Sequence, residues 1–310
     1  MTLDRVLLAL LLLTPAAIVA HVFGAGEITI FVLSGLAIIP LTKFLSDATE
    51  ELANRSGPAV GGLLNATFGN ATELIVGVFA LADGLVNVVK ASLVGSILGN
   101  LLFVLGLAIW FGGVRHTTQR FNVTAARANA SVLLLAATAL VIPAIFFLSA
   151  SSTAFTTEEL SVAVAILMII GYVANLLFAL YTHAHLYVED GREEAVPEPV
   201  RSSMVNVLIL FATTVAIAAL SEQLVGAIKP VLAGLHWTEL FIGAIVIAII
   251  GNAAEHFTAV VAALKNRMDL ALQISIGSAT QILMLVLPAL VLVGAFFPTP
   301  LSLVLSVFEL

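Results

Sequence analysis

The sequence predicts an all-α membrane protein, built as a polytopic bundle of helices. Hydrophobic residues make up 61% of the 310 residues and charged residues only 10%, whereas a typical soluble domain carries roughly 25% charged residues. Long apolar runs recur along the chain, without the alternation of polar and apolar residues that membrane strands require. Because a bilayer offers no hydrogen-bond partners to unpaired backbone groups, such runs are expected to be helices.

Nine apolar segments are long enough, or nearly long enough, to cross a bilayer, which takes about 20 helical residues. They lie at approximately 6–23, 28–46, 58–82, 85–111, 128–149, 159–182, 202–221, 237–264 and 270–297. A tenth apolar run begins at Leu301 and reaches Leu310, and we interpret the chain as truncated within this tenth span. The first segment also resembles a signal peptide, whose removal would leave the topology of the other spans unchanged.

The distribution of positive charge predicts the orientation. If the N-terminus is cytoplasmic, ten of the twelve Lys and Arg residues fall on the cytoplasmic side, and only Lys90 and Lys229 fall on the other. This bias indicates a multi-pass protein of the cell (plasma or inner) membrane with a cytoplasmic N-terminus. The absence of cysteine excludes disulfides and thiolate metal sites. A net charge of −7 argues against binding to nucleic acid.

One short motif occurs twice inside apolar segments and ends each time in a glutamate. Gly69–Glu73 reads GNATE, and 182 residues later Gly251–Glu255 reads GNAAE. A carboxylate at membrane depth is costly, so by default it marks a functional site. The two copies therefore predict one site built from two glutamates, Glu73 and Glu255.

Further echoes indicate two inverted repeats. Gly95-Ser96 and Gly277-Ser278 share the 182-residue offset, and Thr49–Leu52 resembles Ser221–Leu224 at a different offset. The two glutamate spans are five crossings apart, so they are expected to run antiparallel, as in many secondary transporters. The predicted organisation is a first transmembrane helix (1–27), a first repeat (28–188), an acidic cytoplasmic linker (189–200) and an incomplete second repeat (201–310).

The polar residues around the glutamates are oxygen donors. At helical spacing, Asn70 shares a face with Glu73, and Asn252 shares a face with Glu255. Each preceding glycine weakens the helix and can free backbone carbonyls as further ligands. The fourth and ninth spans add a second polar set, although interhelical hydrogen bonding explains these side chains equally well; the set comprises Ser92, Ser96, Asn100, Ser275, Ser278 and Gln281. Oxygen ligands suit a hard divalent cation, above all Ca²⁺.

Two carboxylates in a low-dielectric cavity do not both stay ionised unless a cation lies between them. The site can then hold one divalent ion, or about two protons in its place. If the protein reorients only when the glutamates are neutralised in one of these ways, it exchanges the cation for protons. Glu73 and Glu255 would thus bind both transported species.

The segments GLLNATFGNATELI (62–75), ATEELA (48–53), GSILGNLLFVLG (95–106), GNAAEH (251–256) and IGSATQ (276–281) resemble the signatures of the calcium/proton antiporter (cation/proton exchanger) family. The resemblance covers about residues 28–300. It implies a sodium/calcium-exchanger-like fold of one plus five plus five spans, so the last helices of that pattern would be missing here. It also implies Glu73 and Glu255 as the ion- and proton-binding pair, assisted by Asn70, Asn252 and the polar groups of the fourth and ninth spans. His256 fits the family pattern as well and is assigned to proton coupling.

Other functions fit fewer features. Ser278 and His256 could imitate an intramembrane serine protease, but the equivalent Gly95-Ser96 has no matching histidine. A cation channel normally builds its glutamates into rings of symmetric subunits. Coupling to sodium, or transport of manganese, remains an alternative within the exchanger class. We therefore predict a Ca²⁺/H⁺ antiporter in a lipid bilayer, without enzymatic activity or a cofactor.

Overall fold

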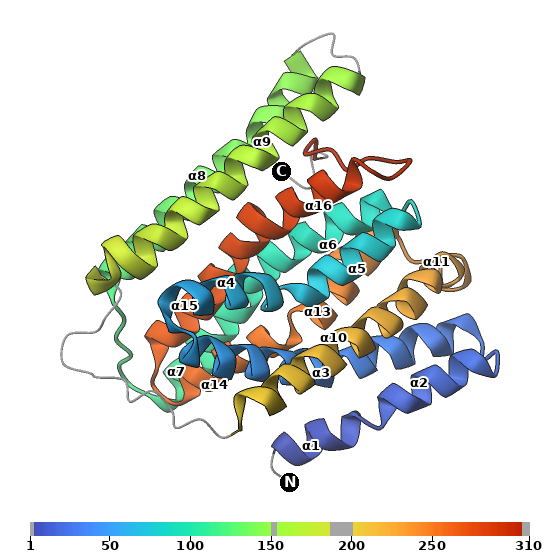
Figure 1. The fold of residues 1–310 in the computed structure, drawn as a ribbon, viewed down its shortest axis with the longest axis horizontal. Coiled ribbons are helices and arrows are strands. Elements are labelled where there is room, and N and C mark those ends of the chain that lie inside the picture. The colour runs from blue at the N-terminus through green and yellow to red at the C-terminus, as the bar shows by residue number, and fades with distance from the viewer. Residues whose placement is uncertain (1–2, 150–153, 187–200, 306–310) are drawn as a thin grey trace. The chain divides into compact units, whose positions relative to one another are not determined.

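The structure is a computed structural model that describes residues 3–149, 154–186 and 201–305. Throughout these ranges the regular secondary structure is helical and no strand occurs, which confirms the all-α prediction (Figure 1). The chain divides into two compact units, unit 1 (1–92 and 198–254) and unit 2 (93–197 and 255–310). Each unit takes segments from both predicted repeats. The repeat boundaries stay a prediction, and the whole predicted linker lies outside the described residues.

Within the described residues, six helices are long and apolar enough to cross a membrane, and they match the predicted second, fourth, fifth, sixth, seventh and ninth spans. The third and eighth predicted spans are each a pair of helices bent at a short break, which raises the number to as many as eight. Both bent spans contain a GNA-x-E motif. Hydrophobic length thus predicted where these spans lie, and the breaks fall at the two motifs.

The first predicted span is divided in two. It consists of two short helices, α1 (Leu3–Leu10) and α2 (Leu13–Val22), separated by a turn at Leu11 and Leu12. Pro15 lies in the first turn of α2, where a missing backbone N–H costs least. The interruption therefore falls just before the proline, and the apolar stretch Val6–Val22 is shorter than the six long spans.

Unit 1 is organised around one long helix, α3 (Glu27–Arg55), against which α2, α4, α10, α11 and α13 pack. Its remaining elements are α4 (Gly57–Phe68), α5 (Ala71–Ala82), the start of α6 (Val86–Leu98), α10 (Ser203–Gly226), α11 (Ile228–Leu235), α12 (Glu239–Phe241), the π-helical segment η4 (Ile242–Ile247) and α13 (Ala248–Gly251). The α10 and α11 side chains Ile217, Leu220, Leu224 and Ile228 are fully buried. In Figure 1 α10, in yellow, runs alongside α3, in blue.

The helices α3 and α10 are antiparallel, as their polar contacts show. Near the C-terminal end of α3, the Arg55 guanidinium donates a hydrogen bond to Ser203 Oγ, 3.0 Å away. Toward its N-terminal end, Ser34 Oγ donates to Gln223 Oε1 at 3.4 Å. These two helices lie in different predicted repeats, so their opposite directions support the inverted arrangement.

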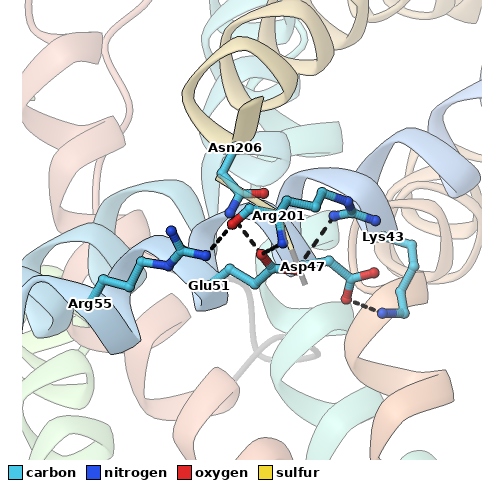
Figure 2. Close-up of polar contacts among 6 residues, drawn as sticks. All are labelled: Lys43, Asp47, Glu51, Arg55, Arg201 and Asn206. Carbon is cyan, nitrogen blue, oxygen red and sulfur yellow. Dashed lines mark hydrogen bonds and ion pairs between the residues drawn. The ribbon is translucent and has the colours of Figure 1, made fainter. Parts of the chain in front are cut away.

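A ladder of charged residues extends α3 beyond its apolar stretch. Lys43, Asp47, Glu51 and Arg55 follow one another at four-residue intervals, so they share one face of the helix. Figure 2 shows this face meeting the start of α10, where Asn206 Nδ2 donates to Glu51 Oε2 at 2.8 Å. The Arg201 guanidinium lies 3.7 Å from Glu51 Oε1, and Arg201 N donates to Glu51 Oε2 at 3.2 Å. With these contacts, α3 continues to Arg55, nine residues beyond the end of the predicted apolar segment at residue 46.

Unit 2 contains the end of α6, the π-helical segment η1 (Gly99–Val104), α7 (Leu105–Arg115), α8 (Val123–Ser149), α9 (Ala154–Leu177), η2 (Phe178–Thr182), η3 (Ala184–Leu186), α14 (Ala253–Leu264), α15 (Met268–Gln281), the π-helical segment η5 (Ile282–Val286) and α16 (Leu287–Gly294). The long helices α8 and α9, in green in Figure 1, pack along each other. α15 contacts α7, α8 and η1. α14 starts at the edge of unit 1 and lies mostly in unit 2.

The loop after α7 caps the far end of the second glutamate helix. His116 Nε2 lies 2.9 Å from the carbonyl oxygen of Leu264, and Gln119 Nε2 donates to the carbonyl oxygen of Ala263 at 2.9 Å. The last carbonyls of a helix lack partners within the helix, so these side chains satisfy them.

The predicted tenth run begins without helical structure, and Leu303 N donates to Ser161 Oγ at 3.0 Å. Its last five residues, 306–310, lie outside the described part of the chain.

Candidate ion-binding site

The first motif breaks its span between two helices. α4 ends at Phe68, Gly69 N donates to the carbonyl oxygen of Asn65 at 2.9 Å, and α5 begins at Ala71 with a bend of 43°. A methyl group on Gly69 would lie 2.4 Å from that same carbonyl oxygen. Backbone cannot yield to such a contact, so the break requires glycine here.

The second motif breaks its span in the same place. α13 ends at Gly251, Asn252 leaves the helical conformation, and α14 begins at Ala253 with a bend of 61°. The segment before α13 is the π-helical η4, whereas α4 before the first break is an ordinary α-helix. The predicted weakening of the helix at each glycine is thus confirmed as a full interruption.

Both asparagines occupy the break and point backwards. Asn70 Nδ2 donates to the carbonyl oxygen of Ala66 at 3.4 Å, and Asn252 Nδ2 donates to that of Ala248 at 3.0 Å. Ala66 and Ala248 are themselves 182 residues apart, so the two breaks repeat the same local contact. Both asparagines are buried, with 2% and 0% of their surface exposed.

Each glutamate lies in the first turn of the helix that follows the break. Asn70 is the N-cap of α5, because its carbonyl oxygen accepts a hydrogen bond from Leu74 N at 3.1 Å. The expectation that each asparagine shares a face with its glutamate stays a prediction. The first turn of a helix exposes unpaired backbone N–H groups and a partial positive charge. A carboxylate is therefore stabilised at Glu73 and Glu255 by the start of its own helix.

Within unit 1, the two motifs touch. A Cβ atom placed on Gly251 would lie 3.3 Å from Glu73 Oε1 and 3.5 Å from Glu73 Cδ, nearer than to any other residue apart from its chain neighbours and the backbone of its own helix. The first glutamate thus packs on the glycine of the second motif, which the sequence did not indicate. Glu255 belongs to unit 2, so the meeting of the two carboxyl groups stays a prediction.

Unit 2 holds most of the second polar set. Asn100 Nδ2 donates to Ser278 Oγ at 3.0 Å, joining η1 to α15. Asn100 and Ser275 are fully buried, while Ser96 and Ser278 are 3% and 8% exposed. The hydrogen bond from Asn100 to Ser278 thus connects the predicted fourth and ninth spans. Ser92 belongs to unit 1, where its hydroxyl donates to the carbonyl oxygen of Val89 at 2.9 Å.

Two π-helical segments flank these donors at equivalent positions. Asn100 lies inside η1, and Gln281 immediately precedes η5, which begins 183 residues after η1. A π-helical turn inside an α-helix often marks a functional position, because it redirects side chains and loosens the backbone hydrogen bonds. Hydrophobic periodicity does not reveal such a one-residue insertion.

Two further polar side chains, those of Tyr172 and His256, have buried polar atoms. Tyr172 of α9, only 3% exposed, has its hydroxyl near the Gln281 side chain but outside regular hydrogen-bond geometry. The sequence analysis did not single out Tyr172. The available signal was its position, since it is one of only three tyrosines in the chain and lies in the middle of the predicted sixth span. His256 follows Glu255, and within the described part of the chain its buried Nε2 atom has no hydrogen-bond partner.

Across the described residues, no three His, Asp or Glu side chains gather into a metal-binding group. The donors available near the motifs are therefore single carboxylates, amide oxygens, hydroxyls and backbone carbonyls. Such a mixed oxygen set is chemically suited to a hard cation that passes through, since Ca²⁺ accepts six to eight oxygens in flexible geometry.

Comparison with known proteins agrees with this architecture. Residues 26–181 and 205–310 match the family described as sodium/calcium exchanger protein. The chain is 44% identical to a Ca²⁺/H⁺ antiporter of Synechocystis sp., over 100% of this chain and 87% of that protein. It is 43% identical to the Ca²⁺/H⁺ antiporter ChaA of Bacillus subtilis, over 96% of this chain and 85% of that protein.

Solved structures give the same result. The structure of native YfkE is similar with a TM-score of 0.84 and 40% identity, covering 98% of this chain and 87% of YfkE. A structure of an H⁺/Ca²⁺ exchanger, CAX, has a TM-score of 0.75 at 16% identity, covers 99% of this chain and 78% of that one, and shows the shared fold. From its matched segments and full-length relatives, the chain belongs to the sodium/calcium exchanger protein family and is similar throughout to calcium/proton antiporters.

Proposed function

We propose that this chain exchanges Ca²⁺ for H⁺ across a membrane by alternating access. Glu73 and Glu255 bind either the cation or protons, and Asn70, Asn252, Ser96, Asn100, Ser278 and Gln281 supply further oxygen ligands. The names of the relatives support the ion pair, and the antiparallel α3 and α10 support the inverted repeats. The proposal implies a transporter in a lipid bilayer and no catalytic reaction.

The observation that carries the proposal is the contact between Glu73 and Gly251. It brings the carboxylate of the first motif against the backbone of the second, four residues before Glu255 in the chain. Both glutamates begin a helix, where the unpaired N–H groups favour an ionised carboxylate. Low dielectric around them disfavours two uncompensated charges. Either Ca²⁺ or protons can relieve this repulsion, and binding of one excludes the other.

The coupling can be tested in proteoliposomes that contain the purified protein. We expect Ca²⁺ uptake that saturates with Ca²⁺ concentration, requires an acidic interior, and collapses when an ionophore dissipates the pH gradient. Proton release measured by an enclosed pH dye should accompany uptake. Uptake driven by a sodium gradient would instead identify sodium coupling, uptake of Mn²⁺ in preference to Ca²⁺ would change the cargo, and flux down the Ca²⁺ gradient without proton movement would identify a channel.

We also propose that the N-terminus is cytoplasmic and that the protein lies in the cell membrane, which the placement of Lys and Arg supports. Because the chain has no cysteine, single cysteines can be introduced without further changes. A cysteine at Arg115 should react with an impermeant maleimide only in inverted vesicles, and one at Lys229 only in intact cells. The opposite pattern would reverse the orientation.

His256 is proposed to assist proton transfer beside Glu255. The variant His256→Gln, which keeps polarity but cannot carry a proton, should narrow the range of pH over which uptake occurs while the protein still binds Ca²⁺. An unchanged pH profile would remove His256 from the mechanism.

A further inference from the structure

A glycine at the end of α13 lies against the carboxyl group of Glu73. Apart from its chain neighbours and the backbone of its own helix, the three atoms nearest to a Cβ built on Gly251 are all in the Glu73 side chain, at 3.3 Å for Oε1 and 3.5 Å for Cδ and Cγ. Separations between 3.0 and 3.4 Å are too tight for unstrained packing of a methyl group. A side chain at position 251 could be accommodated only if the Glu73 carboxyl group moved.

The surroundings of α13 restrict the other ways to relieve this crowding. The neighbouring residue Ile250 packs against α3, and a Cβ on Gly35 of α3 would lie 2.8 Å from Ile250 Cδ1. On the other side of the short helix, Asn252 anchors the break through Ala248. The flexible element in contact with position 251 is the Glu73 side chain, which has three rotatable bonds.

The matching glycine of the first motif has a different neighbour. A methyl group on Gly69 would collide with the backbone oxygen of Asn65, which belongs to its own preceding helix. Gly69 is therefore needed to form the break. Gly251 is needed for the space that it leaves beside the Glu73 carboxylate. The two equivalent glycines of the repeat are therefore required for different physical reasons.

We infer that Gly251 is a positioning residue, which by having no side chain sets where the Glu73 carboxylate lies and hence the size of the cation that the site accepts. The inference rests on the proposed function for its link to transport, but the contact itself does not. A methyl group at 251 narrows the space beside Glu73. Cation binding should then weaken most for the largest ion, in the order Sr²⁺, Ca²⁺, Mn²⁺, while the fold persists.

The first experiment compares Gly251→Ala with Gly106→Ala in proteoliposomes. Gly106 is an exposed helical glycine of α7 where an added Cβ meets nothing within 4 Å, so it controls for the change of residue type. Gly251→Ala should raise the KM for Ca²⁺ by about tenfold, the equivalent of ~1.4 kcal/mol, and the KM for Mn²⁺ by less. Gly106→Ala should leave both unchanged. Equal KM values for wild type and Gly251→Ala would overturn the inference.

A second pair of variants tests whether the effect passes through Glu73. Glu73→Asp withdraws the carboxyl group by one methylene, so adding Gly251→Ala to it should change the KM for Ca²⁺ by less than about twofold. An equally large effect of the methyl group in both backgrounds would show that it acts elsewhere. Failure of Gly251→Ala to fold while Gly106→Ala folds would also contradict the inference, because Glu73 would then be unable to yield.

A third readout is independent of transport. A hydrophobic carbodiimide labels protonated carboxyl groups at membrane depth, and mass spectrometry locates the label. Labelling of Glu73 should be at least about threefold slower in Gly251→Ala than in Gly106→Ala. If the wild type does not exchange Ca²⁺ for protons, the proposed function fails, but this labelling difference still decides the role of Gly251. Equal labelling rates would count against it.

Discussion

The two GNA-x-E motifs share their local structure but not their surroundings. In both, a helix ends at or beside the glycine, the asparagine donates to a carbonyl four residues back, and the glutamate opens the next helix. Yet Gly69 packs on Asn65 of the helix that directly precedes it, whereas Gly251 packs on Glu73 of the other motif. The bends are 43° and 61°. The repeated sequence therefore produces the same local backbone structure in both copies, whereas the tertiary contacts of the two copies differ.

The comparison extends to the far ends of the two glutamate helices. After α5, the carbonyl oxygen of Asp83 accepts a hydrogen bond from Lys229 Nζ at 2.9 Å. At the end of α14, the caps are His116 and Gln119 instead. Side chains from other segments thus hold the C-terminal ends of both helices, a lysine of α11 in the first case and two loop residues in the second. Equivalent substitutions in the two halves should consequently have equal effects only where function demands the same group twice.

The largest effects are expected at the glutamates, where the halves should behave alike. Glu73→Gln and Glu255→Gln should each reduce proton-driven Ca²⁺ uptake by about 100-fold or more, roughly 2.7 kcal/mol, since each removes a charge that only the cation or a proton can balance. The measurement is the initial rate of uptake in proteoliposomes. Glu159→Gln, at an exposed glutamate of α9, serves as the control and should transport normally. Retained activity in one of the two motif variants would mean that a single carboxylate suffices.

The next largest effect separates the two glycines. Gly69→Ala should lower the free energy of unfolding by about 1–3 kcal/mol, because its methyl group collides with rigid backbone. Gly251→Ala should lower it by clearly less, because a flexible side chain can move. Thermal unfolding in detergent, followed by tryptophan fluorescence, measures both. If the two variants are equally destabilised, the difference in their neighbours has no energetic consequence.

The contact between the halves of the second polar set is expected to be smaller in energy. Asn100→Ala and Ser278→Ala should show a coupling of about 0.6–1.5 kcal/mol in a double-mutant cycle on stability. Each single variant should also raise the KM for Ca²⁺, since both side chains are proposed ligands. Ser131→Ala, at an exposed serine of α8 whose hydroxyl donates to the carbonyl oxygen of Arg127, provides the reference for loss of a hydroxyl. Additive effects of Asn100→Ala and Ser278→Ala would indicate that the hydrogen bond contributes nothing.

The smallest effects concern the two ends of the α3–α10 pair. Glu51 contacts Asn206, and Ser34 contacts Gln223. Asn206 lies 172 residues after Ser34, and Gln223 lies 172 residues after Glu51, so the two contacts join equivalent positions of the two repeats. One end is charged and the other is neutral. Glu51→Gln should lower stability by about 0.5–1 kcal/mol, less at high salt because ions screen the partly exposed pair with Arg201. Gln223→Ala should cost less than that, since its hydrogen bond is long at 3.4 Å, and its effect should not depend on salt.

Several features could be predicted from the sequence because they depend on composition and short-range pattern. Eight of the nine apolar segments correspond to a membrane-length helix or to a bent pair of helices. The glycine before each glutamate predicted a weak point, and the breaks occur there. The first segment is split into two short helices just before Pro15.

What only the tertiary structure decided are the contacts between segments distant in sequence. Hydrophobic length determines that a span exists, because every apolar residue contributes to it independently of its neighbours. Such contacts depend on which helices approach each other, and in a bilayer helices associate through close packing of small residues. They include the packing of Glu73 on Gly251, the hydrogen bond from Asn100 to Ser278 and the different bends. The sequence by itself determined the two motif glutamates and the breaks beside them. The fold decided which backbone the Glu73 carboxylate meets, because that choice depends on a residue nearly two hundred positions away.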